Sequence, residues 1–592
     1  MARLDPHSYF DSDQPRTRHL DLDLTVDFAR QCIAGRATLV LAEPASGPLD
    51  LDTKGLTIVS ATSDAGGVAF ELGEEEPILG SRLRLTLPAG TRSVVLACEA
   101  GPGAVGLQWL APEQTAGRRH PFMFSQFQPI HARTMIPCQD SPMVRATYQA
   151  AVTVPEPLTA VMSAGPRGLR PGAGAGQRTM LFEMPQPIPS YLIALAVGDL
   201  VSRDLSPRAR VWAEPGTVEA AAWEFAGVEE MIATAERLFG PYEWDRYDML
   251  VLPPSFPYGG MENPRMTFLT PTVLAGDRSL VDVVAHELAH SWTGNLVTNA
   301  TMDHFWLNEG FTTWAERRIL EALRGEAAAA VSWAIGRTAL KESIARFGSD
   351  SPMTVLRTHL EGVDPDDVYS SVPYEKGSLF VALLERTVGR PKFDKIIREY
   401  IKRFHFTSIT TEELMTFLEQ ELPGAAARAG ADEWLHQPGL PRNAPVFRSA
   451  SLEALTALAE SWAQGARPAP AQVADWSPNE LLVYLQHLPR PLDGASCRWL
   501  DETLGLTGRG NYEILVEWLT IAVTSNHEPV FGRVKEVLTR VGRMKYLRPL
   551  FKALGTSVRT RSLARDIYAE AAPGWHQLSR RVVESVMEQY PD

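Results

Sequence analysis

The most informative stretch of the chain is Ser279–Gly294, which reads SLVDVVAHELAHSWTG. Its first serine, followed by Asp282, resembles a helix-capping pair, and its final glycine is a typical helix end, so the stretch predicts one helix. His286 and His290 are four residues apart and would lie on the same face of that helix, where two imidazole nitrogens can reach one zinc ion. Glu287 would then flank the metal.

A third zinc ligand is expected downstream, in the segment Trp306–Thr312 (WLNEGFT), where 18 residues separate Glu309 from His290. Two histidines and one glutamate form a known catalytic zinc set that leaves a coordination position for water. A linker of this length lets the chain turn and return on a second helix. Glu316, seven residues further on, would share the face of Glu309; it either supports a ligand or is a solvated helix carboxylate.

Outward from this motif, the sequence predicts a multidomain α+β protein. Residues 1–200 contain short runs of alternating apolar and polar residues, such as His19–Asp27 and Arg82–Leu87, which indicate an antiparallel β domain. Residues 201–443 change to helical spacing, with helices expected over Val218–Phe239 and Ser279–Trp292. A Pro-rich connection leads to a linker at 444–452, and residues 453–592 are expected to form stacked helices.

Composition excludes several classes of protein. The 592 residues are 45% hydrophobic and 22% charged, which is ordinary globular material. A net charge of −14 disfavours nucleic acid as a partner. The longest apolar run, Tyr191–Val197, is too short to span a membrane and indicates a buried strand. A polar N-terminus and four isolated cysteines favour a cytoplasmic location.

Further segments add a resemblance to a known family. They are Phe124–Arg133 (FSQFQPIHAR), Pro137–Asp140 (PCQD), Pro257–Asn263 (PYGGMEN), Tyr369–Gly377 (YSSVPYEKG) and Arg543–Tyr546 (RMKY). Together with the zinc motif, over nearly the whole chain, they resemble the M1 (gluzincin) family of zinc aminopeptidases. Within that family, Gln128 and the RMK tripeptide are similar to the leukotriene A4 hydrolase and aminopeptidase B branch.

This resemblance implies a thermolysin-like catalytic domain after the β domain, and a C-terminal α-helical, armadillo-like superhelix. It also implies one zinc ion per chain, short peptides as substrates and a monomer. His286, His290 and Glu309 would hold the zinc, and Glu287 would be the general base and acid. Tyr374 would donate its hydroxyl to the developing oxyanion; the competing interpretation is an ordinary aromatic residue at the start of a helix.

The resemblance also implies a set of substrate-binding residues, namely Gln126, Gln128, Tyr258, Gly259, Gly260, Met261, Glu262, Asp366, Tyr369, Arg543 and Lys545. Glu262 would bind the free α-ammonium of the substrate, and the two glycines before Met261 would let the substrate backbone approach closely. Many family members have a glutamate where this chain has Gln128, so the amine would be held less strongly.

Two of these assignments have competing interpretations. Asp366 matches a family position tied to a preference for basic side chains, but it also fits a surface turn of the Asp-Pro-Asp-Asp type. Arg543 and Lys545 would bind the C-terminal carboxylate of a short peptide, and the strong competing interpretation is a solvated basic helix face, since other basic residues lie nearby.

The sequence thus predicts a zinc-dependent aminopeptidase that removes N-terminal residues from short peptides. The first alternative is a lipid-epoxide hydrolase that uses the same zinc. Phe127 and Met302 depart from the leukotriene A4 hydrolase pattern, so peptide hydrolysis is favoured. The second alternative is a non-catalytic peptide-binding scaffold, which the presence of both Glu287 and Tyr374 disfavours.

Overall fold

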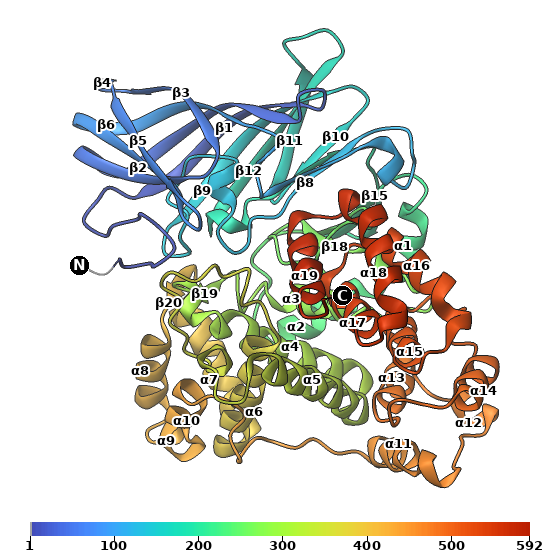
Figure 1. Ribbon diagram of the computed structural model, residues 1–592. Coiled ribbons are helices and arrows are strands. Elements are labelled where there is room, and N and C mark those ends of the chain that lie inside the picture. Colours follow the sequence, from blue (N-terminus) through green and yellow to red (C-terminus); the bar gives the residue numbers. More distant parts are fainter. Residues whose placement is uncertain (1–2, 592) are drawn as a thin grey trace.

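The computed structural model describes residues 3–591 and has three parts (Figure 1). An N-terminal β-rich part (blue to cyan) lies above a mixed part (green to yellow), and a helical part (orange to red) lies beside both. This arrangement confirms the predicted fold class. The domain boundaries at 200 and 443 stay a prediction.

The N-terminal part is built on one large sheet with the order β11-β12-β9-β1-β2-β6-β3-β4, in which β5 also pairs with β6. Its strands are β1 (Thr17–Asp27), β2 (Cys32–Thr53), β3 (Leu56–Ser63), β4 (Gly66–Gly67), β5 (Ala69–Glu76), β6 (Gly80–Ala100), β9 (Arg145–Pro155), β11 (Gly165–Pro171) and β12 (Gln177–Pro189). The alternation predicted for β1 is confirmed, because Leu20, Leu22 and Leu24 are buried between more exposed residues. One prediction needs correction: the sheet is not purely antiparallel, since β1 pairs with β9 in parallel.

A small sheet with the order β10-β13-β8-β7 packs beside it. Its strands are β7 (Leu107–Leu110), β8 (Phe122–Ser125), β10 (Thr159–Met162) and β13 (Leu195–Gly198). The apolar run Tyr191–Val197, predicted as a strand, begins as the end of a 3₁₀ turn and becomes β13 only at Leu195. Among residues 3–591, no helix combines the length and the apolar character that a membrane span requires.

The central part combines short strands with helices. The strands are β14 (Val201–Ser206), β15 (Ala209–Ala213), β16 (Tyr247–Val251), β17 (Gly260–Met261), β18 (Thr267–Leu269), β19 (Val297–Asn299) and β20 (Thr407–Ile409). The helices are α1 (Val218–Glu224), α2 (Val228–Phe239), α3 (Asp282–Ala289), α4 (Trp306–Arg324), α5 (Glu326–Phe347), α6 (Gly377–Val388), α7 (Arg390–Arg403), α8 (Thr411–Glu421), α9 (Ala425–Ala429) and α10 (Ala431–His436). The helix predicted over Val218–Phe239 is therefore two helices, interrupted before Gly227.

An extended segment joins α10 to the C-terminal helices (Figure 1). Those helices are α11 (Ala450–Glu460), α12 (Pro470–Ala474), α13 (Pro478–Gln486), α14 (Gly494–Leu504), α15 (Tyr512–Thr524), α16 (Phe531–Arg540), α17 (Met544–Gly555), α18 (Val558–Ala571) and α19 (Gln577–Met587). Helix α11 takes up the last residues of the linker predicted at 444–452. The stacked helices predicted after it are confirmed.

Two hydrophobic cores explain how these parts are held together. One core runs without interruption from the β-rich part into the central part, and the C-terminal helices enclose a second core of their own. The C-terminal helices are also tied to the central part through backbone. The amides of Gly542 and Met544 donate to the carbonyls of Pro254 and Pro257, at 2.8 and 2.9 Å. The break between α16 and α17 therefore lies directly against the loop that precedes β17.

Candidate functional site

The predicted metal ligands meet at one point between α3 and α4. The Nε2 atoms of His286 and His290 lie 3.2 Å apart, and Glu309 Oε2 lies 3.3 Å from the first and 3.6 Å from the second. Helix α3 is shorter than predicted: it begins at Asp282 and ends at Ala289, so the capping pair does not form. His290 is its C-terminal capping residue, and its ring still lies beside that of His286.

These separations fit a zinc ion. Ligand atoms about 2.0–2.1 Å from a tetrahedral zinc lie about 3.3 Å from one another, close to the spacing found here. The two Nε2 atoms converge on Glu309 Oε2, which is buried and has no hydrogen-bond partner among the described residues. A buried carboxylate oxygen without a partner is costly unless a cation occupies the space in front of it. The donor set therefore fits zinc.

The other ring nitrogen of each histidine is held by α4. His286 Nδ1 lies 3.0 Å from Glu316 Oε2, and His290 Nδ1 lies 3.2 Å from Thr312 Oγ1. Such partners fix the ring orientation and leave Nε2 as the lone-pair donor. Glu316 thus contacts His286, one of the predicted ligands, as the first of its two interpretations requires. Burial lowers the pKa of His290 well below its ordinary value, which keeps this ring neutral and able to bind a metal.

Two further buried carboxylates adjoin the three ligands. A Cβ on Gly260 would lie only 2.2 Å from Glu287 Oε1, so the glycine is what allows Glu287 to lie against β17. Glu262 accepts a hydrogen bond from Gln128 Nε2 at 2.9 Å. Burial, with the charges of Glu262 and Glu309, raises the pKa of Glu287 well above its ordinary value. Burial and the charge of Glu309 raise the pKa of Glu262 to about 8.

Tyr374 faces this cluster from a π-helical turn, Val372–Lys376, that leads into α6. Its ring stacks on that of His286 at 6.0 Å, and its hydroxyl donates to the Tyr369 hydroxyl at 3.3 Å. The next residue, Glu375, accepts two hydrogen bonds from Arg317 Nη2 of α4, at 2.7 and 2.8 Å. The turn that carries Tyr374 is therefore anchored to the helix that carries Glu309, and the Tyr374 ring lies against His286.

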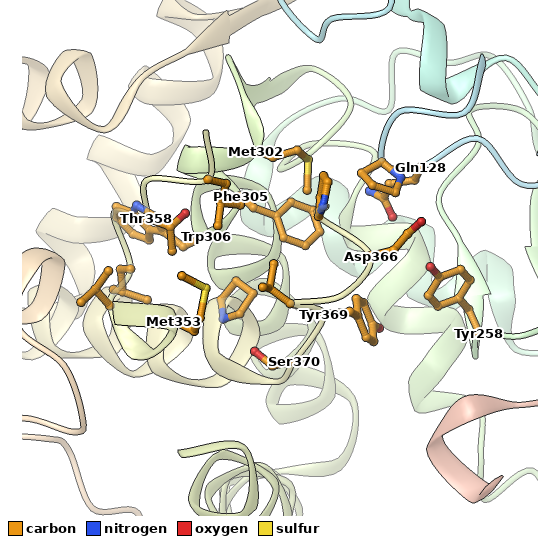
Figure 2. A pocket seen from close by; sticks show the side chains of 17 residues that line it. Gln128, Tyr258, Met302, Phe305, Trp306, Met353, Thr358, Asp366, Tyr369 and Ser370 are labelled. Atoms are coloured by element: carbon orange, nitrogen blue, oxygen red, sulfur yellow. The ribbon is translucent and has the colours of Figure 1, made fainter. Parts of the chain in front are cut away.

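A pocket opens beside these tyrosines (Figure 2). Apolar side chains dominate its lining, among them Met302, Phe305, Met353, Leu356 and Leu360. Gln128, Tyr258, Asp366 and Tyr369 lie toward one end of the pocket (Figure 2). The side chain of Asp366 is 5% exposed and lies 2.8 Å from His131 Nε2, so the alternative of a solvated surface turn is wrong.

Arg543 reaches the site from the start of α17. Its guanidinium is buried, and a Cβ on Gly259 would lie 2.6 Å from Arg543 Nη2. Nη1 lies 2.6 Å from the Tyr546 hydroxyl and 3.4 Å from Glu513 Oε1. Arg543 is thus not part of a solvated basic face. Lys545 is more exposed, at 56%, and pairs with Glu513 Oε2 at 2.7 Å.

The remaining predicted residues lie on the same side of the cleft. Gln126 Nε2 contacts Met261 Sδ at 3.3 Å, and the Tyr258 ring packs edge-on against Tyr369 at 5.4 Å. The contacts described above join the predicted site residues to one another, except Lys545, whose contact is with Glu513 of α15. No role could be assigned to His131 or Arg317 from the sequence, because their partners lie far away in the chain.

Known protein families match three successive stretches of the chain, in the order of the three parts described above. Residues 16–192 match the Peptidase M1 N-terminal domain, residues 223–434 the Peptidase family M1 domain, and residues 476–587 the Leukotriene A4 hydrolase C-terminal domain. These matches cover most of the chain. They agree with the resemblance found in the separate sequence motifs.

Individual proteins that resemble the chain come from the same family. The chain is 39% identical to leukotriene A-4 hydrolase from Xenopus laevis over 598 residues, covering 98% of each sequence. It is 39% identical to aminopeptidase B from Rattus norvegicus over 616 residues, covering 96% of this chain and 94% of the relative. It also superposes on yeast LTA4 hydrolase in complex with bestatin with a TM-score of 0.92, 33% identity, and coverage of 99% and 97%. The chain therefore belongs to peptidase family M1, in the branch that contains the leukotriene A4 hydrolases and aminopeptidase B.

Proposed function

We propose that this M1 zinc aminopeptidase removes the N-terminal residue from short peptides. The observation that carries the proposal is the convergence of His286 Nε2, His290 Nε2 and the unpartnered Glu309 Oε2, with Glu287 and Glu262 beside them. His286, His290 and Glu309 would hold the zinc. When bound, zinc supplies a Lewis acid that polarises the scissile carbonyl and makes water acidic enough to react at neutral pH.

The side chains around it supply the proton transfers and the charge stabilisation. Glu287 takes a proton from the attacking water and delivers it to the departing amine, a role for which its place beside the three ligand atoms suits it. Tyr374 donates its hydroxyl to the oxyanion that develops on the scissile carbonyl. In the free enzyme that hydroxyl donates to the Tyr369 hydroxyl at 3.3 Å, so Tyr374 exchanges this acceptor for the oxyanion when substrate binds.

Recognition of the peptide's N-terminus is assigned to Glu262. The buried Glu262 carboxylate accepts a hydrogen bond from Gln128 Nε2 at 2.9 Å, and a carboxylate with two oxygens can accept further bonds from an α-ammonium group. Gln128 replaces a second carboxylate, so less negative charge meets the amine. Met261, Gly259 and Gly260 form the adjacent edge along which the substrate backbone would lie.

A panel of aminoacyl fluorogenic substrates, assayed with and without a chelator, tests the proposal. Release of the fluorophore that stops on chelation and returns with zinc is expected. N-acetylated versions of the same substrates should resist cleavage, because they lack the ammonium group. Equal cleavage of acetylated and free substrates would contradict the role given to Glu262.

Changing Glu316 to alanine is expected to weaken zinc binding by about 10- to 100-fold, because the His286 ring loses the partner that orients it. The measurement is the zinc dissociation constant, obtained by competition with a chromogenic chelator. Glu321→Ala, on the same helix but away from the ligands, serves as the matched control. Unchanged zinc affinity in the Glu316 variant would remove its supporting role.

Changing Arg543 to alanine is expected to lower kcat/KM for tripeptides by about tenfold, because the peptide carboxylate loses a charge-assisted hydrogen bond. Aminoacyl arylamides lack that carboxylate and should be cleaved at nearly the wild-type rate. Comparison of the two substrate types on one variant gives the answer. Equal losses on both would assign Arg543 to packing between α17 and the catalytic part.

A second candidate function, lipid-epoxide hydrolysis at the same zinc, is favoured by one observation. The pocket beside Tyr369 is lined mostly by apolar side chains, including Met302 and Phe305, and an acyl chain could lie in it. An aliphatic or aromatic side chain of a peptide fits the same lining. We therefore place peptide hydrolysis first.

We propose further that the chain acts as a monomer in the cytoplasm. Cys32, Cys98, Cys138 and Cys497 are free thiols, which fits a reducing compartment. Sedimentation of the purified chain and fractionation of cells test the two statements separately.

A further inference from the structure

The loop that carries Asp366 is held in place by parts of the chain that are remote in sequence. From the N-terminal part, His7 Nε2 lies 2.9 Å from the carbonyl oxygen of Val363. From α19, Arg581 Nη1 lies 3.3 Å from Asp364 Oδ2. Within the loop, the Asp366 amide donates to Asp364 Oδ1 at 3.0 Å. The position of Asp366 is therefore set by all three parts of the molecule.

The contact closest to the Asp366 carboxylate comes from His131, in the N-terminal β-rich part. His131 Nε2 lies 2.8 Å from Asp366 Oδ2, and both side chains are 5% exposed. His131 Nδ1 is buried and has no partner among the described residues. A protonated ring would need acceptors for both N–H groups, so the neutral ring with its proton on Nε2 fits this environment. His131 then donates to Asp366 without cancelling its negative charge.

The neighbouring histidine adds no positive charge either. His576, at the start of α19, is buried, and burial lowers its pKa to about 3, so this ring is neutral as well. Asp366 is the one charged residue in the lining of the pocket as described over residues 3–591. Figure 2 shows its carboxylate at the pocket end where Gln128 and Tyr258 lie. A long basic side chain could lay its methylene groups along the apolar lining and bring its charged end to Asp366.

We propose that His131 is a specificity-positioning residue. By donating Nε2–H to Asp366 Oδ2, it fixes the carboxylate so that Oδ1 faces the first side chain of the substrate, and it thereby favours substrates with a basic N-terminal residue. This inference rests on the proposed aminopeptidase function. His131 does not touch the reacting atoms, so its loss should change selectivity between substrates and leave the chemical step on a neutral substrate intact.

The test compares arginyl- and alanyl-arylamides on the full-length, zinc-loaded enzyme. His131→Asn, whose amide is too short to reach the Nε2 position, is expected to lower kcat/KM for the arginyl substrate by about tenfold. The alanyl substrate should change by less than about twofold. His131→Gln can place an amide N–H where Nε2 lies, and it should restore most of the arginyl activity. His405→Asn, which removes a histidine–carboxylate contact to Glu243 outside this pocket, is the matched control and should affect both substrates little.

A double variant makes the test decisive. Asp366→Asn should lose the preference for arginyl, and adding His131→Asn to it should cause no further loss, because no carboxylate remains to be positioned. Parallel loss on both substrates in His131→Asn, or an additive loss in the double variant, would overturn the proposal. So would an unchanged selectivity in Asp366→Asn. Failure of the proposed function itself looks different, since neither substrate would then show chelator-sensitive cleavage by the wild-type enzyme.

Discussion

Replacing Glu287 with glutamine is expected to reduce peptide turnover by about 10³-fold or more while the protein keeps its zinc. Glutamine preserves the shape and packing of the side chain against Gly260 but cannot take a proton from water or return one to the leaving amine. The measurements are kcat on an aminoacyl arylamide and the zinc content of the purified variant.

Zinc content matters here because Glu287, Glu262 and His290 also bring ligand atoms within 4.8 Å of one another. If that alternative group held the metal, the Glu287 variant would lose zinc together with activity. Retained zinc with lost activity assigns Glu287 to proton transfer. Glu262→Gln provides the control for charge, since it should weaken binding of the free N-terminus more than it lowers kcat. Substantial turnover by zinc-loaded Glu287→Gln would refute the assignment.

Replacing Tyr374 with phenylalanine is expected to lower kcat on peptides by about 10²- to 10³-fold, because one donor to the oxyanion is removed. The effect on any epoxide hydrolysis should be much smaller. Epoxide opening develops charge on the epoxide oxygen and has no tetrahedral intermediate for the hydroxyl to stabilise. Both activities can be measured on one preparation.

Tyr369→Phe is the matched control for this experiment. It removes the hydroxyl that lies 3.3 Å from that of Tyr374 but leaves the proposed oxyanion donor in place, so a smaller loss is expected. Parallel loss of peptide and epoxide turnover in Tyr374→Phe would show that the tyrosine acts in binding or folding. Absence of epoxide turnover in the wild-type enzyme would remove the lipid candidate.

The sequence predicted the parts of the site that depend on local spacing. His286 and His290 are four residues apart, and this spacing places both rings on one side of α3 even though the helix is shorter than expected. Glu309 could be identified because α4 follows the ligand helix after a short connection. The alternation of β1 was predicted for the same reason, since strand periodicity is a local property.

Features that depend on packing between distant parts could not be predicted. Whether Asp366 was a surface residue or a pocket residue depended on His131, which is remote in sequence and lies in another part of the fold. Arg543 fitted a basic surface because its sequence neighbours are basic, yet the backbone bonds of Gly542 and Met544 to the catalytic part turn it inward. The helix predicted over Val218–Phe239 is interrupted between Glu224 and Val228. The periodicity of apolar residues alone does not reveal this interruption at Gly227.

Helix α4 carries Glu309 and Glu316, which both contact His286. It also carries Arg317, which holds the turn of Tyr374 through Glu375. Each residue added to a helix rotates all later residues of that helix by about 100° around its axis. An insertion or deletion of one residue between Glu309 and Glu316 would therefore separate the ligand from the residue that orients His286. Length variation among natural homologues should accordingly fall outside this interval. Anyone who transplants the site to a new scaffold must move this helical segment as one uninterrupted piece.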